Sequence, residues 1–199
     1  PLLAVTALQR GILPLHAGAI TWHGTGIVVT GWSKGGKTET LLATTEAGAR
    51  YVGDEWCYLD PERAMVVGIP EPVTVWAWHL RRFPPLRSQV PRAARARMAL
   101  LDGPDQLERR LPPSLQRTGA GGLLRRVAYH SRTRANAWLS PRDLFGVEQV
   151  SAVPFEHVVL AVTADTGVVS LRPASGADIA DRMVASVCYE LAPLVQAYQ

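Results

Sequence analysis

The residues from Gly31 to Thr38 constrain this chain more than any other part of its sequence. They read GWSKGGKT, which satisfies the pattern GxxxxGK[ST] in full. An apolar run, 27–30, precedes them, and a helical pattern over 38–47 follows and ends at Gly48. A strand, a tight glycine loop and a helix in this order predict an α/β fold.

Each residue type in this loop suits the binding of a triphosphate. Its glycines allow a turn tight enough for successive backbone N–H groups to converge on phosphate oxygens. Lys37 is expected to reach the β- and γ-phosphates, and the Thr38 hydroxyl to bind Mg²⁺. We therefore predict a nucleotide as ligand, with ATP and Mg²⁺ as cofactors, and the choice between ATP and other donors stays open. The predicted nucleotide-binding residues are Gly31, Trp32, Ser33, Lys34, Gly35, Gly36, Lys37, Thr38 and Glu39.

Two adjacent acids, Asp54 and Glu55, follow the predicted strand 50–52 and come sixteen residues after Thr38. Acids at the end of a strand suit phosphoryl chemistry, because one carboxylate can hold Mg²⁺ while the other accepts a proton. The alternative is a solvated acidic turn. Glu39 has two interpretations of equal weight, a Mg²⁺ contact or a favourable charge in the first helical turn. The predicted metal ligands are Thr38, Glu39 and Glu55.

Together these residues resemble the catalytic domain of HPr kinase/phosphorylase. That family has a short motif that contains a histidine, then two strands, a P-loop ending in GK[ST]E, a helix and a paired-acid motif. The corresponding residues are Leu15-His16-Ala17, Gly31–Glu39 and Gly53-Asp54-Glu55, in matching order and spacing over residues 12 to about 72. The resemblance implies a P-loop NTPase-like α/β fold of the HPr kinase/PEP carboxykinase type, a mixed sheet with flanking helices.

For function, the resemblance implies an enzyme, a kinase that transfers the γ-phosphoryl group of ATP to a serine-type hydroxyl of a protein or peptide. Asp54 would be the base toward that hydroxyl. Glu55 would support the metal, where the family usually has aspartate, and His16 would tune Asp54. The catalytic residues so implied are Asp54, Lys37 and His16. The alternative for His16 is a purely structural role. The family also forms hexamers, which makes a homo-oligomer an expectation.

The chain departs from the family downstream of the paired acids. The family's glycine-rich signature for phosphorolysis has no counterpart there, so reverse phosphorylase activity is not expected. Two other functions stay open. One is a kinase acting on a small-molecule hydroxyl, and the other is a nucleotide-binding switch or nucleic-acid-binding module with little catalysis.

The segment from Arg81 to Arg134 holds thirteen arginines and three acids, a net charge of +10 in a chain whose total is +4. Its prolines predict short helices, at 91–101 and 121–129, and a flexible stretch at 119–122. We predict one kinase-like domain over 1–199, with this segment as a helical insert at about 73–134. The arginines form a solvated face, or they bind nucleic acid, an acidic peptide or the nucleotide's phosphates.

Two groups in and beside the insert are further candidates. One is a phosphate-clamping cluster around Tyr129 and His130, formed by Arg125, Arg126, Arg132 and Arg134. The other is Trp76, Trp78 and His79, which either line a pocket or belong to the core.

The rest of the chain predicts a compact, cytoplasmic protein. Cys57 and Cys188 lack metal-binding spacing and are expected to be buried, reduced thiols. No apolar run reaches the about 18 residues that a membrane span needs, and no signal peptide is evident.

In the last part of the chain, strands are expected at 137–139, 157–163 and 168–172. A helix over 177–198, capped by Ser175, is expected to bury the stripe Ile179, Met183, Val187 and Leu191.

Overall fold

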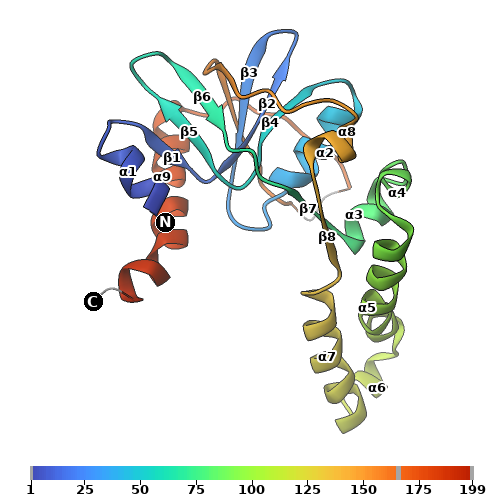
Figure 1. Ribbon diagram of the computed structural model, residues 1–199. Coiled ribbons are helices and arrows are strands. Elements are labelled where there is room, and N and C mark those ends of the chain that lie inside the picture. The colour runs from blue at the N-terminus through green and yellow to red at the C-terminus, as the bar shows by residue number, and fades with distance from the viewer. Residues whose placement is uncertain (1, 165–166, 198–199) are drawn as a thin grey trace. The chain divides into compact units, whose positions relative to one another are not determined.

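The computed structural model describes residues 2–164 and 167–197, and the chain divides into two compact units (Figure 1). The first unit consists of residues 1–71 and 147–199, and the second of residues 72–146. The protein is mixed α/β, with several sheets and flanking helices. The predicted arginine-rich insert lies inside the second unit.

The first unit contains a four-stranded mixed sheet in the order β10-β3-β2-β4. Strand β2 is antiparallel to both its neighbours, and β10 is parallel to β3. The turn between β2 and β3 is His23-Gly24, where both residues have positive φ, as a tight hairpin requires. Thr25 and Gly26 follow the turn and belong to β3. The four strands are β2 (Ala17–Trp22), β3 (Thr25–Thr30), β4 (Arg50–Gly53) and β10 (His157–Leu160).

A second sheet of four strands, antiparallel throughout, has the order β1-β5-β6-β9. Its strands are β1 (Leu13–Leu15), β5 (Cys57–Asp60), β6 (Met65–Gly68) and β9 (Ala152–Pro154). One buried core cluster joins the two sheets, and its members are Leu15, Ala17, Ala19, Val28, Val52, Cys57, Val66 and Val153. The chain passes from one sheet to the other at His16 and again at residues 54–56, so both crossings place polar residues beside this core.

Three helices complete the first unit: α1 (Leu2–Leu8), α2 (Lys37–Glu46) and α9 (Gly176–Ala197). Helix α2 packs on β2 through Leu41 and Leu42, which are almost fully buried. Helix α9 begins as predicted, with the Ser175 hydroxyl accepting a hydrogen bond from the Asp178 backbone N–H at 3.1 Å. Its residue Met183 packs against the core cluster.

The second unit consists of a two-stranded antiparallel ribbon and six helices within the described residues. Its longest helices, α5 and α7, lie side by side (Figure 1). The ribbon strands are β7 (Val73–Trp76) and β8 (Asn136–Leu139). The helices are α3 (Ala77–Arg82), α4 (Leu86–Gln89), α5 (Arg92–Arg110), α6 (Pro113–Gln116), α7 (Gly119–Arg132) and α8 (Pro141–Phe145).

Two predictions for the second unit are wrong. Helix α5 is nineteen residues long and passes through Pro104, because buried residues on both sides of the proline, Met98 and Asp105, hold it in place. Residues 119–122, predicted as a flexible stretch, form the first turn of α7. The Thr118 hydroxyl caps this turn by accepting a hydrogen bond from the Gly121 N–H at 3.2 Å.

Three predictions for the end of the chain also need correction. Residues 168–172 form no strand. Val169 and Leu171 are almost fully exposed, so these side chains lack the burial that favours a strand. The predicted stripe on α9 is only half-buried. Cys57 is buried as expected, but Cys188 is exposed, since it lies on the side of α9 opposite the buried Ser186. In the described parts of the chain, no helix has the length and apolar character needed to cross a membrane.

Candidate functional site

The predicted phosphate loop connects the end of β3 to the start of α2, as the sequence suggests. Gly36 precedes the helix with φ 99°, in the left-handed region, and no side chain caps the first turn. Since no described side chain caps this turn, the N-terminus of α2 suits an anion. A Cβ atom on Gly31 would lie 2.5 Å from the Ala161 carbonyl oxygen, so only glycine fits where the loop passes the end of β10. These features fit a phosphate group.

Lys37 lies at the start of α2 with its side chain folded back on the loop. Its ammonium donates to the carbonyl oxygens of Gly31 at 3.1 Å and Trp32 at 3.2 Å. Burial lowers the pKa of Lys37, and the carboxylates around it, those of Glu55, Asp54, Glu190 and Glu39, act in the opposite direction. The Lys37 ammonium is thus a cationic group that lies among several acids.

Asp54 faces Lys37's helix from the end of β4. The Thr38 hydroxyl donates to Asp54 Oδ2 at 2.9 Å, and the Glu55 backbone N–H donates to Asp54 Oδ1 at 2.9 Å. The pKa of Asp54 is raised, chiefly by burial and next by the charge of Glu55, against the opposing effects of these hydrogen bonds and Lys37. A carboxylate in this environment accepts a proton more readily than an ordinary aspartate.

Glu55 turns in a different direction from Asp54. Its backbone has φ 63°, an unusual value for a residue with a side chain, and its Oε2 lies 3.4 Å from His16 Nε2. A hydrogen bond from His16 is the main reason that the pKa of Glu55 is lowered. The resemblance implied that His16 tunes Asp54. In the structure His16 contacts Glu55, so its influence on Asp54 passes through the charge of Glu55.

The C-terminal helix α9 contributes three residues that sequence reasoning missed. The buried Ser186 hydroxyl lies 2.9 Å from His16 Nδ1, and Glu190 Oε1 lies 3.8 Å from the same nitrogen. One residue earlier, the Tyr189 ring meets Trp32 edge to face, with centroids 5.9 Å apart. The sequence signal for these residues is their i, i+3, i+4 spacing, which puts them on one face of the helix. Nothing in the sequence indicated that this face meets the loop.

The remaining predicted loop residues take outer positions. Trp32, Ser33 and Lys34 are exposed, and the Lys34 carbonyl oxygen accepts a hydrogen bond from the Thr163 hydroxyl at 3.4 Å. Glu39 is half-buried in the first turn of α2 and acts electrostatically on Lys37.

The described residues contain no cluster of three or more His, Cys, Asp or Glu side chains that could hold a metal ion. Mg²⁺ bound with a nucleotide takes one or two protein ligands and completes its shell with phosphate oxygens and water. The Thr38 hydroxyl at the start of α2 and the Glu55 carboxylate, whose charge acts on Lys37, fit that smaller requirement as hard oxygen donors.

The other candidates belong to the second unit. Trp76 stacks on Trp78 at 4.8 Å, and buried His79 accepts a hydrogen bond from the Trp76 N–H, so these residues hold β7 against α3. Of the predicted arginine cluster, Arg132 lies 3.4 Å from buried Asp105. Arg125 donates to a backbone carbonyl, and Arg126 and Arg134 line a pocket beside α7.

No protein-family model matches the chain, and no curated protein matches it.

Proposed function

We propose that this protein is a Mg²⁺-dependent kinase that transfers the γ-phosphoryl group of ATP to a hydroxyl of a protein or peptide, on a P-loop fold of the HPr kinase type. The observation that carries the proposal is the 2.9 Å hydrogen bond from Thr38 to Asp54. It holds a buried carboxylate against the first turn of the phosphate-loop helix, where a transferable phosphoryl group would lie.

Lys37 and the loop amides supply the binding of the triphosphate. The Lys37 ammonium is held by two loop carbonyl oxygens, and it can exchange them for phosphate oxygens with little movement. When bound, Mg²⁺ neutralises charge on the β- and γ-phosphates. Thr38 and Glu55 are the residues that would hold it, with Glu39 as a further candidate.

Asp54 supplies the base. Its raised pKa favours acceptance of the acceptor's hydroxyl proton, and its two hydrogen bonds fix the direction of its carboxylate. His16 Nε2 contacts Glu55, and Ser186 and Glu190 in turn contact His16 Nδ1, which keeps the second acid beside the first.

The test measures two properties of the purified chain, the binding of Mg-ATP and the transfer of labelled γ-phosphate to a serine-peptide array and to a panel of sugars. We expect Asp54→Asn to retain ATP binding and lose transfer, and Glu46→Gln, an exposed acid at the far end of α2, to change neither.

Each alternative function predicts a different result. Transfer to sugars alone indicates a small-molecule kinase, and ATP binding without any Asp54-dependent transfer indicates a nucleotide-binding switch. If the chain fails to bind Mg-ATP, the proposal is wrong.

A further inference from the structure

The second unit has far more positive charge than its own acids can neutralise. Residues 72–146 include fourteen arginines and four acids. Those acids are engaged within the unit: Asp102 with Arg81, Asp105 with Arg109 and Arg132, Glu108 with Arg125, and Asp143 with the Ser140 hydroxyl. Fourteen arginines against four acids leave the unit with a net charge of +10.

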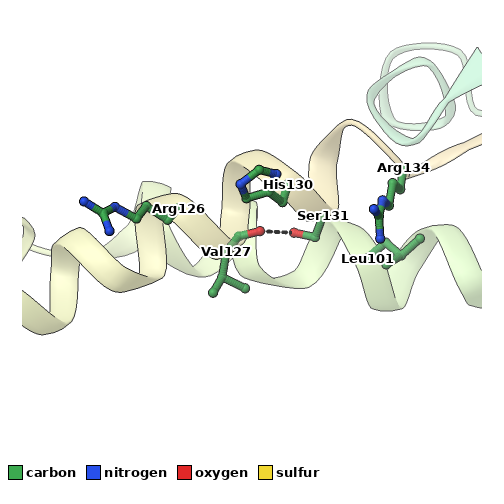
Figure 2. Close-up of a pocket in the computed structure, with 6 residues that line it drawn as sticks. All are labelled: Leu101, Arg126, Val127, His130, Ser131 and Arg134. Carbon is green, nitrogen blue, oxygen red and sulfur yellow. Dashed lines mark hydrogen bonds between the residues drawn. The ribbon is translucent and has the colours of Figure 1, made fainter.

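Two of these arginines flank a pocket of about 460 Å³ between α5 and α7. Figure 2 shows Arg126 and Arg134 at opposite ends of it, with His130 and Ser131 between them. The Ser131 hydroxyl donates to the Val127 carbonyl oxygen at 2.7 Å. The apolar lining consists of Leu101 from α5 and Val127 from α7. Within the described residues, neither Arg126 nor Arg134 has a carboxylate partner.

Three of the lining residues share one face of α7 with Leu123, which lies outside the pocket. Leu123, Arg126, Val127 and His130 recur at i, i+3, i+4 and i+7, and therefore share a side of α7. This face mixes apolar and basic groups, and it is open to solvent: Leu123 is 65% exposed and Val127 46%. On the neighbouring helix α5, Leu100 is 78% exposed.

We propose that this α5–α7 groove docks an amphipathic polypeptide segment that carries carboxylate side chains. The two flanking guanidinium groups complement carboxylates, and Leu101, Val127 and Leu123 complement apolar side chains on the same segment. A nucleic-acid backbone offers charge but no apolar group for this lining, and base stacking needs more aromatic surface than Tyr129 provides. This binding is separate from the nucleotide site and does not depend on the proposed kinase activity.

The test uses the full chain and a fluorescein-labelled peptide of Glu, Leu and Ala arranged as an amphipathic helix. Its comparison ligands are a scrambled peptide of the same composition, polyglutamate and a DNA duplex, all measured by fluorescence anisotropy at one salt concentration. We expect the amphipathic peptide to bind best. The double change Arg126→Ala with Arg134→Ala should weaken that binding roughly five- to tenfold, since exposed ion pairs are individually modest.

Two further variants separate this groove from general positive charge. The double change Arg92→Ala with Arg117→Ala removes the same charge from exposed positions of the same unit outside the pocket, and should leave peptide binding nearly unchanged. Val127→Ser should weaken binding of the amphipathic peptide but not of polyglutamate or DNA. Circular dichroism checks that each variant is folded.

Three outcomes would overturn the proposal. Equal binding of polyglutamate or DNA would show a general polyanion surface, and equal losses in the two arginine pairs would show that the pocket is not the site. Self-association that is abolished by the Arg126 and Arg134 changes would show that the groove is occupied by a second copy of this chain.

Discussion

Thr38 and Asp54 are joined by a hydrogen bond of 2.9 Å between Thr38 Oγ1 and Asp54 Oδ2, across sixteen residues of chain. Thr38 lies in the first turn of α2 and Asp54 directly after β4, so the bond connects the start of the loop helix to the end of a strand. Since β4 pairs with β2, and β2 with β3, the sheet itself fixes the distance between the loop and the carboxylate.

The first prediction concerns the two lysines of the chain, which both lie in the loop. Lys37→Ala should weaken Mg-ATP binding about tenfold to a hundredfold, because interactions with charged groups contribute about 1.5–3 kcal/mol. Lys34→Ala is the matched control: Lys34 is exposed and its ammonium contacts neither Gly31 nor Trp32 in the described structure, so we expect at most a small change. Isothermal titration calorimetry measures both. Equal losses would contradict the assignment of Lys37.

The second prediction concerns the Ser186 hydroxyl, which lies 2.9 Å from His16 Nδ1. Ser186→Ala removes the partner of His16 Nδ1 and should lower stability by about 1–3 kcal/mol. It should also lower the rate of phosphate transfer, because His16 then no longer holds Glu55 in one orientation. Urea unfolding measures stability, and steady-state kinetics separate kcat from KM.

Ser175→Ala is the control for that experiment. It removes the N-cap of the same helix, α9, and should cost about 1 kcal/mol without touching His16. A fall in kcat in the Ser186 variant alone would identify Ser186 as a positioning residue. A similar fall in both variants would mean that α9 acts only through general stability.

The sequence predicts the local parts of this structure well. The order of strand, glycine loop and helix around Gly31–Thr38 depends on neighbouring residues, and the turns of the β2–β3 and β5–β6 hairpins have the same local origin. The contacts of His16 cannot be predicted in this way, because its partners on α9 lie far away in the sequence. Ser186 lies 170 residues away, and helical periodicity identifies the inward face of α9 without saying what that face meets.

The course of α5 is unpredictable from its sequence for a related reason. Proline predicts the end of a helix from local chemistry, but buried contacts on both sides of Pro104 decide its continuation. The same limit applies to residues 168–172, where β-branched residues predict a strand and the structure has none.

The third prediction follows from that proline. Pro104→Ala restores a backbone N–H within α5, where it can bond to the Leu100 carbonyl, and should stabilise the protein by about 1–3 kcal/mol. Pro113→Ala is the matched control, because Pro113 lies at the start of α6, where a missing N–H costs little. Urea unfolding followed by helical circular dichroism measures both. Equal effects in the two variants would mean that Pro104 does not strain the helix.

The fourth prediction concerns the buried charge of Asp54. Because its pKa is raised in the folded protein, the ionised carboxylate is disfavoured there, and this group's contribution to stability is present at low pH and lost as pH rises through the folded pKa. Asp54→Asn cannot ionise. Its amide oxygen can still accept from Thr38, while the bond from the Glu55 N–H is lost at every pH. The variant should therefore gain stability relative to the parent as pH rises from the ordinary pKa range of aspartate to neutral.

Urea unfolding at acidic and neutral pH measures this difference, and Glu46→Gln again serves as the exposed control, with no pH-dependent gain expected. The same variant should lose phosphate transfer, so a gain in stability would accompany a loss of function, as is common where an active site keeps a buried charge. A stability difference between the variant and the parent that stays constant from acidic to neutral pH would show that ionisation of Asp54 does not destabilise the fold. The raised pKa, and with it the argument for Asp54 as the base, would then be wrong.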